Sequence, residues 1–316
     1  MKFTYLTIFL FMSILSCKKE NNQIIEKQFD DIYTLIKEES IYNEHVNWTS
    51  IYLNVKDSIK AFNSLNDKYI AIEYVLSQLP DQHAFFLQPN DSIRFLSTKN
   101  KEIPKVHYKI IDKTIGYIKI NGFAANDSLS KIYSSNIRKA LLEIDQTSDL
   151  DGWILDVRNN QGGKVGTFAL GISPLYSDSI IGYSKTNKLE YKPHKISKNS
   201  YHFGSAIINS ISQKSTLRNS KAKIAILVNK KTASLAEFLA LTLKSQKNTR
   251  IFGQKTAGFT TDLMTYQFVS GAEFGFSTSY MCDRDKKEQI TGLIPDVTCS
   301  DGEEVNFAIK WIKNAI

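Results

Sequence analysis

The chain has 316 residues, with 40 Lys and Arg against 32 Asp and Glu, and a formal net charge of +8. Its basic residues are scattered and form no stripe with interleaved aromatics. This argues against nucleic-acid binding and favours a solvated surface with some attraction to anionic lipid or cell wall. The five histidines lack the spacing of metal ligands, so we expect no metal and no other cofactor.

Residues 1–16 are predicted to be a signal peptide. Lys2 precedes an apolar run at 3–15 that is too short to span a membrane and has the length of a signal-peptide core. The run ends in Leu-Ser-Cys, which resembles a bacterial lipoprotein signal and implies that Cys17 is lipidated. The alternative is an ordinary signal peptide in which Cys17 is incidental. We expect an extracytoplasmic lipoprotein of the cell envelope, anchored in a membrane and facing the periplasm or the cell surface.

A helical N-terminal domain is predicted for residues 24–100, after a polar tether at 17–23. Apolar residues recur at steps of three and four from 24 to 79. Pro80 ends the last helix, and residues 81–83 form a predicted turn before the apolar segment 84–87.

Residues 101–316 are predicted to form an α/β domain. Strands are expected at 117–120, 152–157, 224–228 and 250–252, with helices at 128–144 and 233–243. This alternation implies parallel strand pairing. Residues 185–220 are polar and predict a long loop or flap. Short strands are expected over 263–298, and a closing helix over 305–316. Cys282 and Cys299 are either bridged or free and buried, and both alternatives remain open.

Ser234 lies where a predicted buried strand gives way to a helix. The first N–H groups of a helix are unpaired and its dipole is positive there, so the position favours an anion. A serine hydroxyl at that point can attack a carbonyl, and the N–H of Leu235 can help to hold the resulting oxyanion. The alternative is structural, because Ser234 and Glu237 have the spacing of a capping box.

Other turns carry residues with chemical potential. Gly162 and Gly163 follow the strand at 152–157, and glycines there let backbone N–H groups point into a cleft. His83 follows a helix stop, and glycine turns occur at 253–258 and 292–296. Each of these features, taken alone, is also typical of an ordinary turn or surface residue.

The order of these segments resembles the C-terminal processing (tail-specific) peptidase family. Four motifs occur in the family's order: Leu-Asp-Val-Arg-Asn-Asn-x-Gly-Gly at 155–163, Val-Asn-x-x-Thr-Ala-Ser-x-x-Glu at 228–237, Gly-x-x-Thr-x-Gly at 253–258 and Gly-x-x-Pro-Asp at 292–296. The resemblance covers residues 70–300 and implies an α/β fold, a Clp protease/crotonase-like catalytic domain with an N-terminal helical cap. Leu-x-Asp-x-His-x-Phe-Phe at 79–86 is most similar to the lipoprotein branch related to the tricorn protease core.

This resemblance assigns roles to individual residues. It implies that Ser234 is the nucleophile and that the N–H groups of Leu235 and of Gly162 or Gly163 form an oxyanion hole. Family members with a Ser–Lys dyad carry a lysine at the position that Phe259 occupies here.

The general base is therefore assigned to His83, as in the branch that uses a histidine. Lys255 lies four residues before Phe259 and is expected to be a solvated side chain. Glu288 is a candidate for the carboxylate that orients His83.

The resemblance also predicts a reaction. About thirty residues separate His83 from Tyr117, too few for the PDZ module that tail-specific peptidases often carry there. We expect a lipid-anchored serine peptidase that cleaves peptides or unfolded protein segments through an acyl-enzyme, with the substrate bound as an added strand. The alternatives are a non-catalytic peptide- or ligand-binding lipoprotein on the same fold, and an esterase acting on small acyl substrates.

Overall fold

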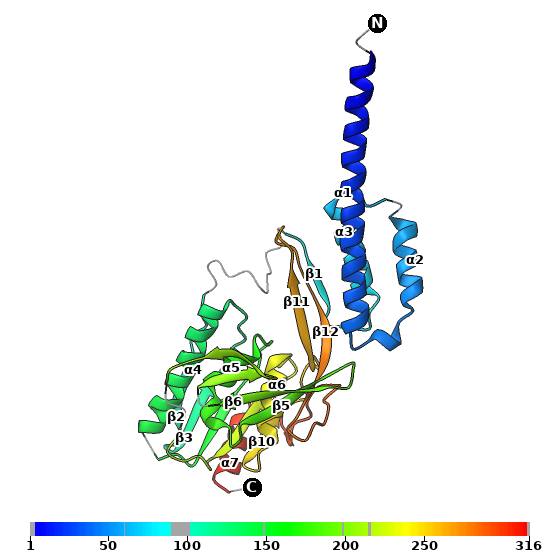
Figure 1. Ribbon diagram of the computed structural model, residues 1–316. Coiled ribbons are helices and arrows are strands. Elements are labelled where there is room, and N and C mark those ends of the chain that lie inside the picture. The colour runs from blue at the N-terminus through cyan, green and yellow to red at the C-terminus, as the bar shows by residue number, and fades with distance from the viewer. Residues whose placement is uncertain are drawn as a thin grey trace. The chain divides into compact units, whose positions relative to one another are not determined.

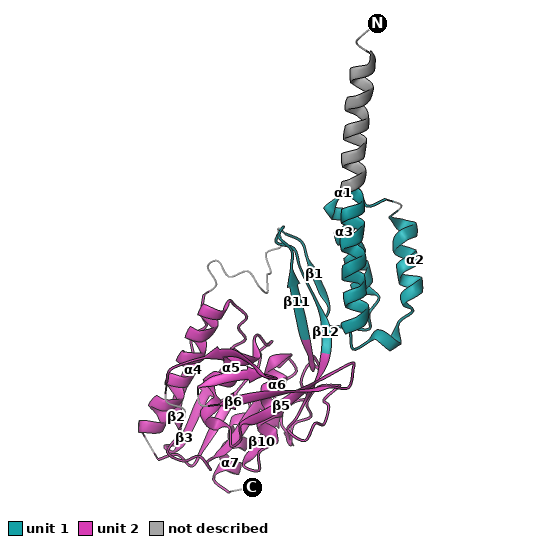
Figure 2. Cartoon of the chain, viewed as in Figure 1, with its two compact units in different colours: residues 1–93, 263–278 teal, residues 94–262, 279–316 magenta. Residues whose placement is uncertain are grey.

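A computed structural model describes residues 4–59, 61–89, 102–147, 149–197, 199–213 and 216–314, with side chains described from residue 22 onward. The chain forms two compact units (Figure 2). The first, here called the helical unit, comprises residues 1–93 and 263–278. The second, the α/β unit, comprises residues 94–262 and 279–316. The sequence prediction had included 263–278 in the α/β domain.

The described residues of the helical unit include three α-helices, in line with the helical periodicity of 24–79 (Figure 1). They are α1 (Thr4–Glu39), α2 (Trp48–Ser58) and α3 (Leu65–Ser77), with a short 3-10 helix, η1 (Asn43–His45). Strand β1 (Phe85–Leu87) pairs antiparallel with the first residues of β12 (Glu273–Cys282). Phe274 and Phe276 of β12 pack into the core of the three helices, which explains why 263–278 belongs to this unit.

The centre of the α/β unit is a six-stranded sheet in the order β13-β10-β9-β4-β3-β2. The strands are β2 (His107–Ile111), β3 (Ile115–Lys119), β4 (Gly152–Asp156), β9 (Lys223–Val228), β10 (Thr249–Gly253) and β13 (Val297–Thr298). All neighbours pair in parallel except β2 and β3. The predicted α/β alternation is thereby confirmed.

Helices cover both faces of this sheet. Alternate strand residues such as Leu155 and Ile226 pack with α4 (Asp127–Thr147), α5 (Val165–Gly171) and α6 (Leu235–Lys244). Ile154 and Leu227 point to the other face, where α7 (Glu304–Ile312) covers them. Because β4 and β9 are parallel neighbours, the loops that follow them leave the sheet at the same edge.

The prediction of a long loop over 185–220 was wrong. An antiparallel meander is formed by β5 (Ile180–Thr186), β6 (Tyr191–Ser197), β7 (Ser200–Phe203) and β8 (Ala206–Ser210). The end of β12 adds to β5, and β11 (Thr261–Gln267) also pairs with β12. A 3-10 helix, η2 (Ser173–Leu175), precedes the meander. Buried side chains such as His194, Ile196 and Tyr201 alternate with more exposed ones along these strands, as in a sheet with one covered face. The many lysines of this segment made the two-residue period hard to detect in the sequence.

Cys282 and Cys299 are both free and buried, which decides between the two alternatives left open above. Burial raises the pKa of the Cys282 thiol to about 12, so it stays protonated. Within the described ranges, no cluster of His, Cys, Asp and Glu could hold a metal ion. None of the helices in those ranges is long and apolar enough to cross a membrane.

His194 is the buried histidine of the meander, with 2% of its surface exposed. Burial lowers its pKa to about 3, so its imidazole is neutral in the folded protein. Its ring faces the phenol of Tyr201 and the hydroxyl of Ser184, and Ser184 in turn faces the carboxylate of Asp262.

This burial predicts a specific loss of stability in acid. The unfolded chain protonates His194 near the ordinary pKa of 6.5, whereas the folded protein does so only near 3. The contribution of neutral His194 to the free energy of unfolding is therefore complete above pH 6.5. It is lost as the pH falls towards 3, by up to about 1.4 kcal/mol per pH unit. Urea unfolding between pH 7 and pH 4.5 should show a flatter dependence in His194→Gln than in the wild type. His202→Gln, on the neighbouring strand, controls for loss of a histidine, and equal slopes in His194→Gln and the wild type would contradict the prediction.

Candidate active site

Ser234 occupies a strained turn between β9 and α6. Its φ of 55° and ψ of −125° differ from the extended conformation of an ordinary N-cap residue. A positive φ in a residue with a side chain costs about 1–3 kcal/mol and persists only where surrounding contacts hold it. The backbone thus gives a first reason to treat Ser234 as more than a helix cap.

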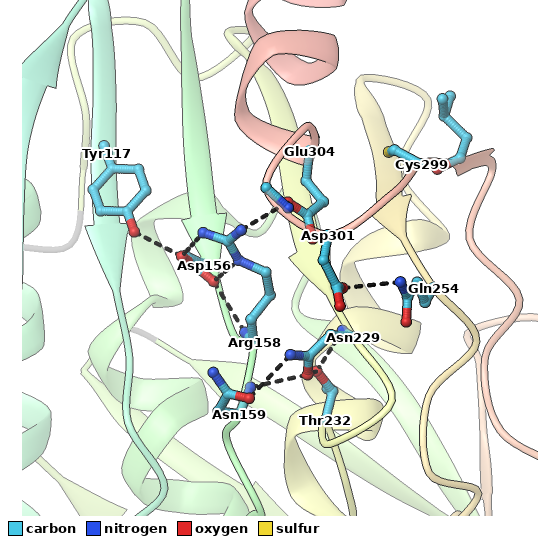
Figure 3. A network of polar contacts seen from close by, with 12 residues as sticks. Tyr117, Asp156, Arg158, Asn159, Asn229, Thr232, Gln254, Cys299, Asp301 and Glu304 are labelled. Carbon is cyan, nitrogen blue, oxygen red and sulfur yellow. Dashed lines mark hydrogen bonds and ion pairs between the residues drawn. The ribbon is translucent and has the colours of Figure 1, made fainter.

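The loop after β4 is hydrogen-bonded to the loop that carries Ser234. The N–H of Ala233 donates to the carbonyl oxygen of Asn160 at 2.9 Å. Asn159 and Asn229 are joined twice, because the Asn159 N–H donates to Asn229 Oδ1 and Asn229 Nδ2 donates to Asn159 Oδ1, both at 3.0 Å (Figure 3). These bonds fix residues 157–163 beside the start of α6.

Gly162 makes the closest approach to Ser234. A Cβ built on Gly162 would lie 2.9 Å from Ser234 Cβ, 3.2 Å from Ser234 Oγ and 3.1 Å from the backbone nitrogen of Leu235. Its φ of 106° is a second reason why only glycine fits. The structure therefore brings together Ser234, Leu235 and the predicted glycine pair.

The two glycines differ in what their N–H groups can do. The Gly162 N–H donates to Asn160 Oδ1 at 2.8 Å, and Asn160 is itself buried and bonded to the carbonyl of Ile120. Gly163 has a φ of 148° and lies against the carbonyl of Phe123, where a Cβ would come within 2.0 Å. The Gly162 N–H is thus engaged within its own loop, and the absence of a side chain at Gly162 leaves space beside Ser234. The oxyanion-hole role of Gly162 or Gly163 stays a prediction.

Glu237 is a fully buried carboxylate in the first turn of α6. It accepts hydrogen bonds from the N–H of Ser234 at 2.9 Å, from the N–H of Gly258 at 2.9 Å and from the hydroxyl of Thr256. Burial raises the pKa of this carboxyl above its usual value, although the hydrogen bonds from Thr256, Gly258 and Ser234 act in the opposite direction. Glu237 supplies the carboxylate of the predicted capping box and also ties Ser234 to the 253–258 turn.

The two other glycine motifs meet at Thr256. Its N–H donates to the carbonyl of Leu293 at 3.1 Å, and the N–H of Leu293 donates back to the Thr256 hydroxyl at 2.7 Å. The next residue, Ala257, donates to the carbonyl of Thr232 at 2.9 Å. Lys255 is exposed, as expected for a solvated side chain.

A buried ion network anchors the start of the 157–163 loop. Arg158 donates through two nitrogens to both carboxylate oxygens of Asp156, at 2.9 and 2.6 Å, and through a third to Glu304 of α7 at 2.8 Å (Figure 3). Tyr117 of β3 donates to Asp156 at 2.6 Å. The hydrogen bonds from Asp156 hold the pKa of Arg158 above its usual range, whereas burial in the first place raises that of Tyr117. This network joins three elements at the carboxyl edge of the sheet.

Sequence reasoning assigned no role to Arg158, Asn160 or Thr256. Arg158 and Asn160 lie in a motif that was read only for its glycines, and their partners are distant in sequence. Glu237 was identified, but only as a cap.

His83 lies in the helical unit, on the predicted turn after α3. Its backbone N–H donates to Asp81 Oδ1 at 3.0 Å, and Asp81 also accepts from the N–H and the hydroxyl of Ser277, each at 2.8 Å. The turn is thereby fixed to β12 within this unit. The role of His83 as a base stays a prediction.

Glu288 lies in the α/β unit and forms an ion pair with Lys185 of β5 at 2.5 Å. Residues 282 and 288 form an isolated antiparallel bridge. The proposed orienting role of Glu288 stays a prediction. Cys17 lies outside the part of the chain whose side chains are described.

Comparison with known proteins places these features in a family context. The sequence model of peptidase family S41 matches residues 114–299, which is more than half of the chain. The chain is 26% identical over 195 residues to the nisin-resistance protein of Lactococcus lactis subsp. lactis, covering 61% of this chain and 58% of that protein. It is 24% identical over 218 residues to the carboxyl-terminal-processing protease of a Picosynechococcus species, covering 65% of this chain and 46% of that protein. It therefore spans less than two thirds of either relative.

The fold is similar to that of a solved lipoprotein from Streptococcus agalactiae. The TM-score is 0.75 at 21% identity, and the match covers 92% of this chain and 97% of the other. At that identity the match establishes the fold.

Proposed function

The chain belongs to peptidase family S41, and on that premise we propose that it is a serine peptidase with Ser234 as its nucleophile. The observation that carries the proposal is the approach of Gly162 to Ser234. It clears space beside the hydroxyl while the Leu235 N–H lies next to it. A serine at a helix start, with a glycine loop against it, is an arrangement suited to acyl transfer, because backbone N–H groups lie close to the hydroxyl.

The proposed reaction has two halves. Ser234 Oγ attacks the peptide carbonyl carbon as its proton passes to His83, and the oxyanion accepts hydrogen bonds from the N–H groups of Leu235 and Gly163. The C–N bond then breaks while His83 returns the proton to the departing amine, leaving an ester on Ser234. Water, deprotonated by His83, attacks that ester, releases the new carboxylate and restores the serine hydroxyl.

His83 is proposed as the base because Phe259 stands where the Ser–Lys members of the family carry lysine, and because Lys255 is exposed. Glu288 is proposed to orient the imidazole, with Lys185 as its present ion-pair partner.

We also propose that the protein is an extracytoplasmic lipoprotein anchored through Cys17. The apolar run at 3–15 that ends before Cys17 supports this, and so does the fold shared with a lipoprotein of Streptococcus agalactiae. Mass spectrometry of the mature N-terminus tests the assignment, because an unmodified residue 17, or cleavage elsewhere, would remove it.

For substrates we propose peptides or unfolded protein segments. The name of the relative from Lactococcus lactis makes nisin a reasonable test substrate beside an unstructured peptide. Phe259 at the lysine position favours one rival, a non-catalytic binding lipoprotein on the same fold. Binding of a peptide without turnover, together with no labelling of Ser234 by a fluorophosphonate, would support that rival, and turnover of acyl esters alone would support an esterase.

Substituting Gly162 tests the observation on which the function rests. In Gly162→Ala the new Cβ would press on Ser234 at 2.9 Å, and the backbone would keep an unfavourable φ of 106°. We expect the rate of Ser234 labelling by a fluorophosphonate to fall by about 100-fold or more, because a displacement of about 1 Å at a reacting centre has that effect.

The matched control is Gly204→Ala, which also has a positive φ, 60°, but no atom within 4 Å of the added Cβ. It should lower the melting temperature modestly and leave the labelling rate unchanged. If both variants label like the wild type, the space at Gly162 has no part in reactivity.

A further inference from the structure

We propose that a buried hydrogen-bonded chain, Asp262–Ser184–His194–Tyr201, positions the two halves of the Ser234 site against each other. We call it the polar chain. It lies within the α/β unit and takes no part in the reaction steps above. Its consequence for reactivity rests on the proposed function, whereas its mechanical role does not.

The direction of each hydrogen bond in the polar chain follows from chemistry. The Ser184 hydroxyl donates to Asp262 Oδ2, which also accepts from Ser279 at 3.1 Å. Ser184 Oγ therefore accepts from His194 Nε2, 2.6 Å away. His194 Nδ1 is then unprotonated and accepts from the Tyr201 hydroxyl at 2.6 Å. With Asp262 ionised, this one neutral tautomer of His194 satisfies every member of the chain.

His194 contacts the first turn of the nucleophile helix. Its ring lies 4.6 Å from the ring of Phe238, measured between centroids. Phe238 is one helical turn after Ser234, and its N–H donates to the Ser234 carbonyl at 3.2 Å. The neighbouring strand β5 also packs against Phe238, since a Cβ built on Gly182 would lie 3.2 Å from the Phe238 ring. A shift of His194 would therefore move the start of α6.

Tyr201 contacts the first turn of α5, which follows the glycine loop. A Cβ built on Gly166 would lie 2.8 Å from the Tyr201 ring, so the ring rests directly on the α5 backbone. Gly166 is three residues after Gly163. The hydrogen bond between Tyr201 and His194 therefore links two side chains. Tyr201 packs on α5, which follows the glycine loop, and His194 packs on the first turn of α6, which follows Ser234.

Asp262 connects the polar chain to a third segment. It is four residues after Gly258, whose N–H donates to the Glu237 carboxylate beneath Ser234. Between them, Thr260 accepts from the N–H of Met281 at 3.1 Å, which holds this segment to β12. The polar chain thus packs on the first turns of α5 and α6 and adjoins the segment that follows Gly258, and it positions these three segments.

Tyr201→Phe tests this role, because it removes one hydroxyl and keeps the ring on Gly166. The matched control is Tyr176→Phe, which removes a hydroxyl 2.9 Å from Thr242 Oγ1, at the other end of the same helix α6. Both variants should lose thermal stability. Only Tyr201→Phe should speed hydrogen exchange in peptides covering 160–168 and 229–238, because only this variant removes the hydrogen bond to His194 that holds both loops.

The kinetic readout separates positioning from stability. For Tyr201→Phe we expect the fluorophosphonate labelling rate and kcat to fall about ten-fold with KM unchanged, and for Tyr176→Phe changes below about two-fold. Unchanged exchange in Tyr201→Phe, or equal effects in the two variants, would overturn the proposal. If exchange rises as expected but even wild-type Ser234 does not label, the proposed function fails while the positioning role stands.

Discussion

Ser234→Ala is expected to abolish peptide hydrolysis and labelling by a fluorophosphonate, with kcat falling by about three to six orders of magnitude. The reason is that the hydroxyl is the group that forms the acyl-enzyme, and alanine offers no replacement. The folded state should change little, because alanine meets the same backbone constraint at φ 55° that serine does. Steady-state hydrolysis of an unstructured peptide and mass spectrometry of the labelled protein measure the two effects.

A second serine on the same helix provides the control. Ser245 is the C-cap residue of α6, and its hydroxyl lies 3.4 Å from the carbonyl of Leu241. Ser245→Ala should label and turn over like the wild type. Labelling that persists in Ser234→Ala would show that the reactive serine is another one and would end the proposed mechanism.

The sequence predicted the parts of the site that depend on local pattern. A run of branched apolar residues followed by a helical period placed Ser234 between β9 and α6, and adjacent glycines marked the loop after β4. Parallel pairing of β4 and β9 then brought these two segments together, because the carboxyl ends of neighbouring parallel strands share an edge. These two elements and their turns were therefore predictable from local pattern, whereas the place of Gly162 beside Ser234 was implied by the family resemblance.

Contacts between distant side chains were not predictable. Arg158 and Glu304 are 146 residues apart, and Ser184 and Asp262 are 78 residues apart, with no local pattern that links the members of either pair. The meander was missed for a related reason. Its lysines suggested a loop, while the inward positions were filled by residues such as His194 and Tyr201, whose polar atoms are satisfied by each other and by Ser184.

The base is the assignment with the next largest expected effect. His83→Gln should lower kcat by about three orders of magnitude or more, because Ser234 would lose the group that takes its proton. Glutamine is close to histidine in size and retains the backbone N–H that donates to Asp81, so the turn in the helical unit should persist. Circular dichroism and the melting temperature check that persistence, and single-turnover labelling of Ser234 reports its reactivity directly.

Lys255→Ala separates His83 from its rival. An exposed lysine should contribute little, so this variant should keep the wild-type rate. The double variant His83→Gln with Ser234→Ala should be no less active than Ser234→Ala alone, because a nucleophile and its base act as one unit and their losses do not add. A full rate in His83→Gln combined with a large loss in Lys255→Ala would assign the base to the lysine. Full rates in both variants would mean that Ser234 is activated by neither group.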